Sequence, residues 1–237
     1  MTKQIKNSDR LIFAMDVPEA DQARSLAERL GESVTFYKLG LELMMPGGYF
    51  GLIDWMVERD KKVFVDLKFF DVPATVGRAV ARLASRGVTF ATVHGNQGIM
   101  EAAAASKGDV KVLAVTALTS LDRGDLDDLG FKCDVGELVL SRARRALEAG
   151  CDGVVASGLE LPAMRKEVDN RLLVVTPGIR PVENRPSDDQ KRVVTVEQAF
   201  RDGADYIVVG RPIRDAEDPR GAAEGIQATI AEVLGAQ

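Results

Sequence analysis

The chain has 237 residues, of which 46% are hydrophobic, and its net charge is −5. No apolar run reaches the roughly 20 residues of a membrane helix, and residues 1–10 are polar, unlike a signal peptide. No Lys/Arg-rich block indicates a nucleic-acid surface, and Cys133 and Cys151 lack the spacing of a disulfide framework or a zinc site. We therefore expect a cytoplasmic protein that binds neither membranes nor nucleic acids, with one domain over residues 1–237.

Short apolar segments alternate with amphipathic helical segments along the chain. Strands are expected at residues 11–16, 35–39, 63–71, 89–95, 110–116, 153–156, 172–176 and 206–209. Helices are expected at residues 20–30, 50–59, 73–86, in the alanine-rich segment after residue 95, and at 135–149, with a loop at 121–134. Strands alternating with helices indicate a parallel sheet, and eight of them imply closure, so the predicted fold is a (β/α)8 TIM barrel.

The third expected strand carries charges where a buried strand should be apolar. Alternation by two places Asp66 and Lys68 on the same face as Phe64 and Phe70, and Asp71 opens the following turn. Charged groups are rarely buried unless paired, so one interpretation is a structural ion pair. The other is a catalytic cluster, because barrel enzymes carry their chemistry at the carboxyl ends of the strands.

Further polar residues stand at the ends of other expected strands. They are Asp16, Lys38, His94, Thr119, Arg180 and Arg211. Opposite charges gathered at one rim favour each other's ionised forms, which predicts a preorganised electrostatic site. Individual members have structural alternatives: Asp16 could cap the following helix, and His94 could be a structural residue. Thr116 and Thr119 could bond either the backbone or a ligand.

Glycine and arginine recur together after the seventh and eighth strands, in Gly178-Ile179-Arg180 and in Gly210-Arg211. The loops after these strands form the usual phosphate site of such barrels, and an arginine fork matches phosphate oxygens. A solvated surface arginine is the alternative for either pair alone. The long polar segment 180–192 carries two prolines and is a candidate lid over this site.

Seven motifs extend these observations along nearly the whole chain. They are Phe13–Asp16, Tyr37–Gly40, Asp66–Thr75, Val115–Ser120, Pro177–Arg180, Asp189-Gln190 and Gly210–Pro212. With these motifs the chain resembles the orotidine 5′-phosphate decarboxylase family in its bacterial form. Phe70 departs from the histidine often found at this position in the family, and the segment between Arg180 and Gln190 is one residue longer. Neither departure removes a charged member of the motifs.

The resemblance implies the last step of pyrimidine nucleotide synthesis, from orotidine 5′-monophosphate to uridine 5′-monophosphate and carbon dioxide, without a metal or other cofactor. It implies a catalytic network of Lys38, Asp66, Lys68 and Asp71, with Lys68 as the proton donor. It also implies a homodimer in which Asp71 and Thr75 reach the neighbouring site. The implied substrate-binding residues are Asp16 and Lys38 for the ribose, Thr75 and Thr119 for the nucleotide, and Arg180, Gln190, Gly210 and Arg211 for the phosphate.

Two other functions fit part of the pattern. A magnesium-dependent sugar-phosphate decarboxylase or synthase of a related barrel would share the Asp-x-Lys-x-x-Asp spacing, although Asp71–Thr75 fits the nucleotide enzyme better. A noncatalytic barrel could keep the phosphate arginines and use the charges structurally. Turnover of orotidine monophosphate in the presence of a chelator would distinguish the three.

Overall fold

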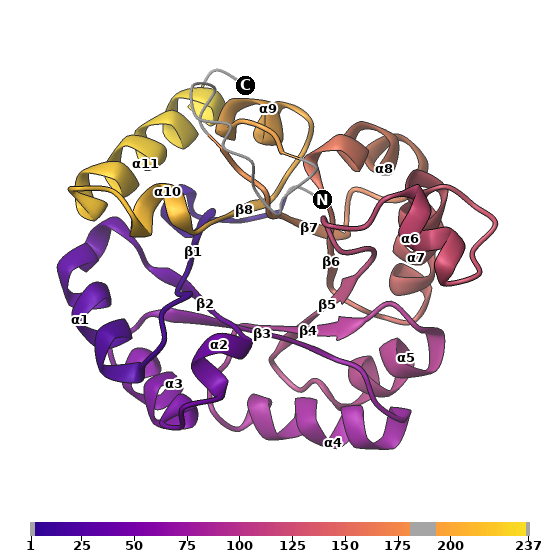
Figure 1. The fold of residues 1–237 in the computed structure, drawn as a ribbon, viewed down its shortest axis with the longest axis horizontal. Coiled ribbons are helices and arrows are strands. Elements are labelled where there is room, and N and C mark those ends of the chain that lie inside the picture. Colours follow the sequence, from indigo (N-terminus) through magenta and orange to yellow (C-terminus); the bar gives the residue numbers. More distant parts are fainter. Residues whose placement is uncertain (1–2, 181–192, 236–237) are drawn as a thin grey trace.

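The computed structural model describes residues 3–180 and 193–235. In this part of the chain, eight parallel strands close into a barrel in sequence order (Figure 1). The strands are β1 Leu11–Ala14, β2 Phe36–Leu39, β3 Lys62–Phe69, β4 Phe90–His94, β5 Lys111–Val115, β6 Gly153–Val155, β7 Leu173–Thr176 and β8 Tyr206–Val209. Leu11 of β1 pairs with Ile207 of β8, which closes the ring. The predicted (β/α)8 fold is confirmed.

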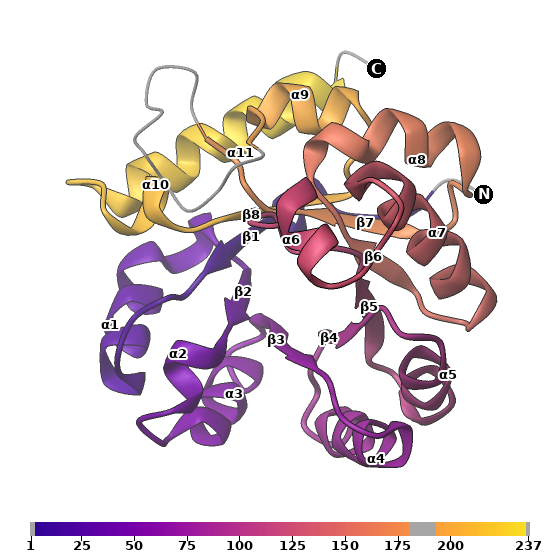
Figure 2. The ribbon, with the colours of Figure 1, turned by 45° about the vertical axis from the view of Figure 1, so that its right-hand side comes forward.

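The helices lie around the outside of the strands (Figures 1 and 2). The α-helices are α1 Ala20–Leu30, α2 Leu41–Met44, α3 Tyr49–Val57, α4 Pro73–Ala84, α5 Gln97–Ser106, α6 Arg123–Asp128, α7 Val135–Glu148, α8 Leu161–Glu167, α9 Val196–Arg201, α10 Arg211–Arg214 and α11 Pro219–Gly235. Short 3₁₀ turns occur at η1 Asn7–Asp9, η2 Gly31–Ser33 and η3 Gly158–Glu160. Each predicted helix is present, with its ends shifted by no more than two residues.

The loop expected at residues 121–134 contains a helix, so that expectation was wrong for residues 123–128. Helix α6 begins with a capping box, in which the Asp122 carboxylate accepts from Asp125 N and the Asp125 carboxylate accepts from Asp122 N. Reciprocal capping satisfies backbone donors that a short helix otherwise leaves unpaired. Leu126 is buried and anchors the turn. The polar composition of residues 121–134 indicates neither the capping box nor the burial of Leu126.

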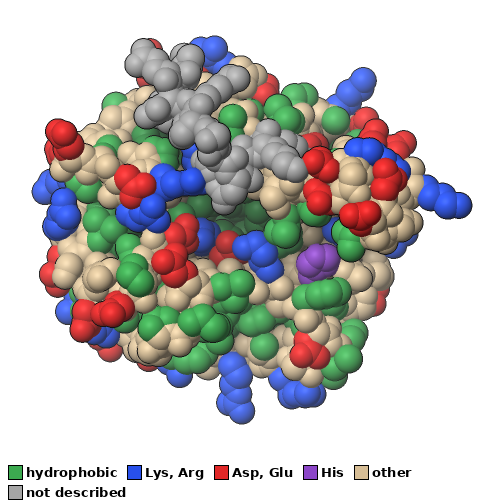
Figure 3. Space-filling view, in the orientation of Figure 1, with side chains coloured by type: hydrophobic (Ala, Val, Ile, Leu, Met, Phe, Trp, Pro, Cys, Tyr) green, Lys and Arg blue, Asp and Glu red, His purple; other side chains and the backbone are tan. Residues whose placement is uncertain are grey.

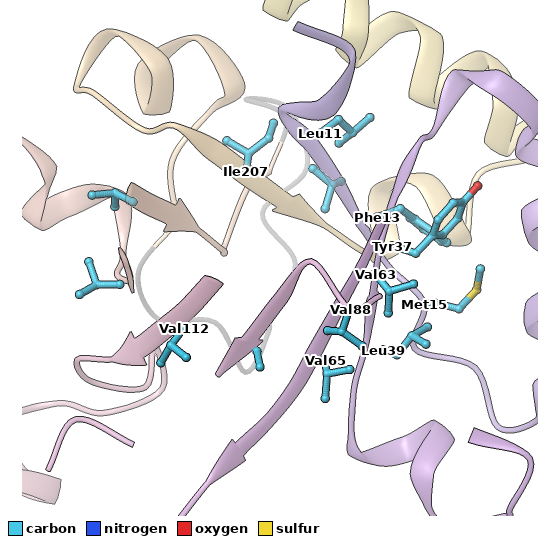
Figure 4. Close-up of a cluster of buried hydrophobic side chains, with 14 of the residues drawn as sticks. Leu11, Phe13, Met15, Tyr37, Leu39, Val63, Val65, Val88, Val112 and Ile207 are labelled. Carbon is cyan, nitrogen blue, oxygen red and sulfur yellow. The ribbon is translucent and has the colours of Figure 1, made fainter. Parts of the chain in front are cut away.

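Buried side chains fall into two groups according to the face of the strand that they occupy. Alternate residues such as Leu11, Phe13 and Ile207 point outward and pack beneath the helices (Figure 4). The other residues fill the barrel interior, where Phe90 contacts Phe36, Phe64 and Tyr206 at ring-centroid distances of 5.0, 5.9 and 5.1 Å. Side chains that fill the barrel in layers make it a packed core rather than a pore. This aromatic layer excludes water below the mouth of the barrel.

Strand β3 has a bulge at the position where its charges occur. Val65 pairs with Ala91 of β4, but the next pair joins Phe69 to Val93, so three residues of β3 lie opposite Thr92 alone. Lys68 within the bulge has a φ of 47°, in the left-handed region. The extra residues break the alternation that we expected through Phe70. Phe70 is 67% exposed and does not share an interior face with Phe64.

Candidate active site

A cavity of about 550 Å³ opens at the carboxyl ends of the strands. Its described lining includes the charged residues Asp16, Lys38, Asp66, Lys68, Arg180, Arg211 and Arg214, which are five cations and two carboxylates. Charged side chains gather around a hollow at the centre of the ring (Figure 3). The mouth of the barrel is therefore locally positive on a chain whose net charge is −5. A concave basic site of this size suits an anionic small molecule.

Four of these residues form a row of alternating charge across β1, β2 and β3. The Lys38 ammonium lies 2.9 Å from Asp16 Oδ1 and 3.8 Å from Asp66 Oδ2. The Lys68 ammonium lies 2.9 Å from the same Asp66 Oδ2. The side chains of Lys38 and Asp66 are each 13% exposed, whereas that of Lys68 is 35% exposed. Lys68 is thus the ammonium of the row that is more accessible from the cavity.

Asp66 is the electrostatic centre of the row. Burial, the largest single effect, would raise the pKa of its carboxyl, but the positive charges of Lys38 and Lys68 lower it, and the resulting pKa lies below its usual value. Hydrogen bonds from Lys68 and from the Thr92 hydroxyl act in the same direction. Since each of these contacts favours the charged form, Asp66 is an anion at neutral pH.

The phosphate motifs of the sequence meet at the same cavity. Gly178, Arg180, Gly210 and Arg211 all line it, and Arg180 Nη1 donates to the carbonyl of its neighbour Ile179 at 2.9 Å. Gly210 packs closely against β1, because a Cβ at this position would lie 3.3 Å from Ala14 Cβ. Backbone and guanidinium groups therefore converge from β7 and β8, as the order of the two motifs predicts.

Two predicted site residues lie outside the cavity of this chain. Asp71 is exposed, and its carboxylate accepts a hydrogen bond from Val72 N at 2.6 Å. Thr75 lies in the first turn of α4, where its hydroxyl accepts from Arg78. A third predicted residue, Gln190, lies outside the described residues, as does the candidate lid beyond Arg180. The structure therefore brings Asp16, Lys38, Asp66, Lys68, Thr119, Arg180, Gly210 and Arg211 together, but not Asp71 or Thr75.

The contacts of Asp16, His94 and the two threonines distinguish the structural from the functional interpretation of each residue. Asp16 pairs with Lys38 and does not cap α1, whose first residue follows Glu19. The Thr116 hydroxyl donates to the Val155 carbonyl at 2.9 Å, and this buried threonine is not part of the described lining, whereas Thr119 is. His94 stacks on Phe70 with 4.5 Å between ring centroids, and its Nδ1 lies 2.8 Å from Asn96 Oδ1. Thr116 and His94 thus have structural contacts outside the cavity.

Sequence reasoning missed two residues at this site. Arg214 lines the cavity and donates to the Asp16 carbonyl at 2.8 Å. Its signal was the spacing of three from Arg211, which places both on one side of a helix. Thr92 contacts Asp66 through its hydroxyl, and its signal was a polar residue at the alternation of Phe90 in an apolar strand. Neither signal is distinctive in the sequence, because the contacts to Asp16 and Asp66 form only in the folded chain.

In residues 3–180 and 193–235, no cluster of three or more His, Cys, Asp or Glu side chains could hold a metal ion. Over the same ranges, no helix combines the length and apolar character needed to cross a membrane.

Comparison with known proteins identifies the family. The model of the orotidine 5′-phosphate decarboxylase / HUMPS family matches residues 9–226. The chain belongs to this family. The resemblance seen in the motifs is confirmed.

Curated relatives within the family carry the decarboxylase name. The chain is 69% identical to orotidine 5′-phosphate decarboxylase of Methylococcus capsulatus, over 99% of this chain and 97% of that protein. It is 52% identical to the enzyme of that name from Xanthomonas axonopodis pv. citri, over 95% of this chain and 93% of that protein. These relatives favour the carboxy-lyase over both alternative functions.

Solved structures agree with the fold. The crystal structure of orotidine 5′-phosphate decarboxylase from Lactobacillus acidophilus is 33% identical, with a TM-score of 0.83, and the match covers 94% of this chain and 99% of that chain. The enzyme from Pyrococcus horikoshii is 23% identical with a TM-score of 0.75, over 93% of this chain and 98% of that chain, and supports the fold alone.

Proposed function

We propose that this chain decarboxylates orotidine 5′-monophosphate to uridine 5′-monophosphate, with Lys68 stabilising and then protonating pyrimidine C6. The observation that carries the proposal is the row Asp16, Lys38, Asp66 and Lys68 in a cationic cavity. Relatives that are 69% and 52% identical bear the name of this activity. The reaction itself explains why a barrel mouth would hold such a row.

The chemical difficulty is the carbanion that the departing carbon dioxide leaves behind. The C6–carboxylate bond breaks, its electron pair remains on C6, and no adjacent carbonyl delocalises the charge as an enolate. An ammonium held beside C6 stabilises that charge as it develops. The Lys68 proton then moves to C6, which completes the product, and solvent restores the ammonium.

Asp66 holds that ammonium in place. Its carboxylate lies 2.9 Å from Lys68 Nζ in a partly enclosed site, where electrostatic interactions are stronger than in water. A fixed dipole that is present before the reaction needs little reorganisation during it. Repulsion between Asp66 and the substrate carboxylate is a second contribution, which we rank below stabilisation of the carbanion.

The remaining cavity residues bind the parts of the substrate that do not react. Arg180 and Arg211 would hold the phosphate, with Gly210 allowing the backbone to approach, and Gln190 would cover it. Asp16 and Lys38 would bind the ribose hydroxyls, and Thr119 the pyrimidine. Binding energy from the remote phosphate would support orientation and desolvation at C6.

We further propose a homodimer with shared sites, in which each single-domain chain contributes Asp71 and Thr75 to its neighbour. Asp71 follows the bulge and is exposed, between the side chains of Phe70 and Val72, which are 67% and 63% exposed. Adjacent apolar side chains exposed on this scale are typical of an interaction surface. A second copy seated here would cover them and bring Asp71 toward the neighbouring Lys68. We expect this dimer in the cytoplasm.

An ultraviolet assay of orotidine monophosphate loss, run with and without excess chelator, tests the activity and its independence of metal. We expect full turnover in chelator, because no step requires a metal. Substrate loss that disappears with chelator and returns with Mg²⁺ would instead support the magnesium-dependent alternative.

The Lys68→Ala variant tests the assigned role in the same assay. Because the variant lacks both the ammonium and the proton source, turnover should fall more than about a thousandfold while uridine monophosphate still binds. Lys166→Ala, at an exposed lysine of α8, is the matched control and should keep wild-type turnover. Residual Lys68→Ala turnover within tenfold of wild type would refute the assignment.

A further inference from the structure

The bulge in β3 is bridged by one side chain of β4. Asp66, Leu67 and Lys68 lie opposite Thr92, which is fully buried. The Thr92 hydroxyl accepts from the Lys68 backbone N–H at 3.0 Å and donates to Asp66 Oδ1 at 2.9 Å. A hydroxyl has one proton to donate and lone pairs to accept, so both bonds form together. Thr92 therefore holds the backbone of one charged residue and the side chain of the other.

The two oxygens of the Asp66 carboxylate have different partners. Lys38 and Lys68 both approach Oδ2, at 3.8 and 2.9 Å. Thr92 approaches Oδ1 at 2.9 Å. A carboxylate held at one oxygen can turn about its Cβ–Cγ bond, whereas contacts at both oxygens fix its orientation. Thr92 thus sets the direction in which Asp66 presents Oδ2 to Lys68.

The backbone at Lys68 also depends on this contact. Its φ of 47° lies in a region that residues with a side chain adopt rarely. Bulges near active sites redirect a side chain at the cost of regular strand pairing. The Thr92 hydroxyl accepts a hydrogen bond from the backbone N–H of Lys68, the residue with the positive φ. This bond supports the backbone conformation that directs the Lys68 side chain into the cavity.

We propose that Thr92 is a positioning residue for the decarboxylation, setting the geometry of Asp66 and Lys68 without touching the substrate. This inference rests on the proposed function. A small displacement of a reacting group can cost much of the rate while leaving substrate binding intact. Loss of Thr92 should therefore appear in kcat rather than in the affinity for nucleotide.

Two substitutions separate the hydroxyl from the methyl group. Thr92→Val keeps the shape and removes the hydroxyl, whereas Thr92→Ser keeps the hydroxyl and removes the methyl. A hydrogen bond to a charged group corresponds to a rate change of about ten- to a hundredfold, so kcat of Thr92→Val should fall by that factor. Its affinity for uridine monophosphate should stay within about threefold of wild type. Thr92→Ser should keep kcat within about threefold, even if it melts at a lower temperature.

If Thr92 only stabilised the fold, the loss of turnover in each variant would parallel its loss of thermal stability. Thr92→Val turning over as fast as wild type, or Thr92→Ser losing as much as Thr92→Val while folded, would overturn the inference. If Thr92→Val does not fold, Thr92→Ser and Thr92→Cys form a second pair that differs in donor strength at nearly constant size, and we expect Cys to be slower by about tenfold. Equal kcat for that pair would also overturn the inference.

The same measurements distinguish this inference from the proposed function. Wild-type turnover together with an inactive Lys68→Ala variant supports the function, whatever Thr92 does. A normal Thr92→Val rate in that setting refutes the positioning role alone. Absence of wild-type turnover would refute both.

Discussion

At the scale of single residues, the site is explained by how each charge is compensated. Asp66 is buried deeply enough to raise the pKa of an isolated carboxyl, yet Lys38 and Lys68 keep it ionised. Arg180 and Arg211 line the same cavity, after β7 and at the start of α10. A guanidinium fork matches phosphate oxygens, so the contribution of Arg211 to phosphate binding can be measured.

Arg211→Ala tests the phosphate site. A lost hydrogen bond to a charged group costs roughly 1.5 to 3 kcal/mol, so uridine monophosphate should bind about ten- to a hundredfold more weakly. The affinity for uridine, which has no phosphate, should change little when both are measured by calorimetry. Arg201→Ala, at an exposed arginine ending α9, is the control. Equal weakening of nucleotide and nucleoside would place Arg211 elsewhere in the site.

At the scale of elements, close packing between strands determines where a side chain can stand. Strand β6 is short and begins at Gly153, between β5 and β7. A Cβ at Gly153 would lie 2.5 Å from the Leu173 carbonyl oxygen and 2.8 Å from Leu113 Cδ2. The strands could accommodate such an atom only by moving apart. Glycine here serves close approach, since its φ is not among the positive values.

Gly153→Ala should therefore lower the free energy of unfolding by about 1 to 3 kcal/mol, because it overpacks the barrel. Chemical denaturation with a fluorescence readout measures the change. Gly225→Ala in α11 is the matched control, because a Cβ there meets no atom within 4 Å. Alanine in a helix should stabilise that variant by about 0.5 to 1 kcal/mol. A Gly153→Ala protein as stable as wild type would show that β6 has more room than these distances indicate.

At the scale of the whole molecule, the cavity and the exposed surface around Asp71 both bear on whether two chains share each site. The described lining of the cavity contains Lys68 but not Asp71. Exposed Phe70 and Val72 flank Asp71 on the outer surface. A two-fold interface would bury these apolar side chains and complete both sites at once. The proposed dimer can be tested by mixing two inactive chains.

If Asp71 serves the neighbouring site, Lys68→Ala and Asp71→Ala homodimers should be inactive but complementary when mixed. The mixed dimer has one site that lacks both groups and one that lacks neither. Random pairing of equal amounts makes half of the dimers mixed, so about a quarter of wild-type activity should return under two-fold symmetry. Mass spectrometry of tagged chains confirms subunit exchange. With exchange shown and no activity recovered, Asp71 would act within its own chain.

The sequence by itself determined the barrel, the rim that holds the chemistry and most of the charged residues there. Strand and helix periodicity is local, and parallel strands in alternation with helices place all their carboxyl ends at one face. Its motifs also identified the family that the comparisons confirm. Asp16 and Lys38 could be grouped because each lies at or near the end of its expected strand, and Asp66 because it is a charge within a buried strand.

Only the tertiary structure decided how those residues meet. The bulge in β3 depends on its register against β4, and the bond from Thr92 to Asp66 joins positions 26 residues apart. Likewise, Arg214 reaches the Asp16 carbonyl across 198 residues, and Asp71 lies outside the cavity although it follows Lys68 closely in the sequence. A pattern within one segment carries no information on what lies opposite it, because such contacts form only when distant strands are placed side by side.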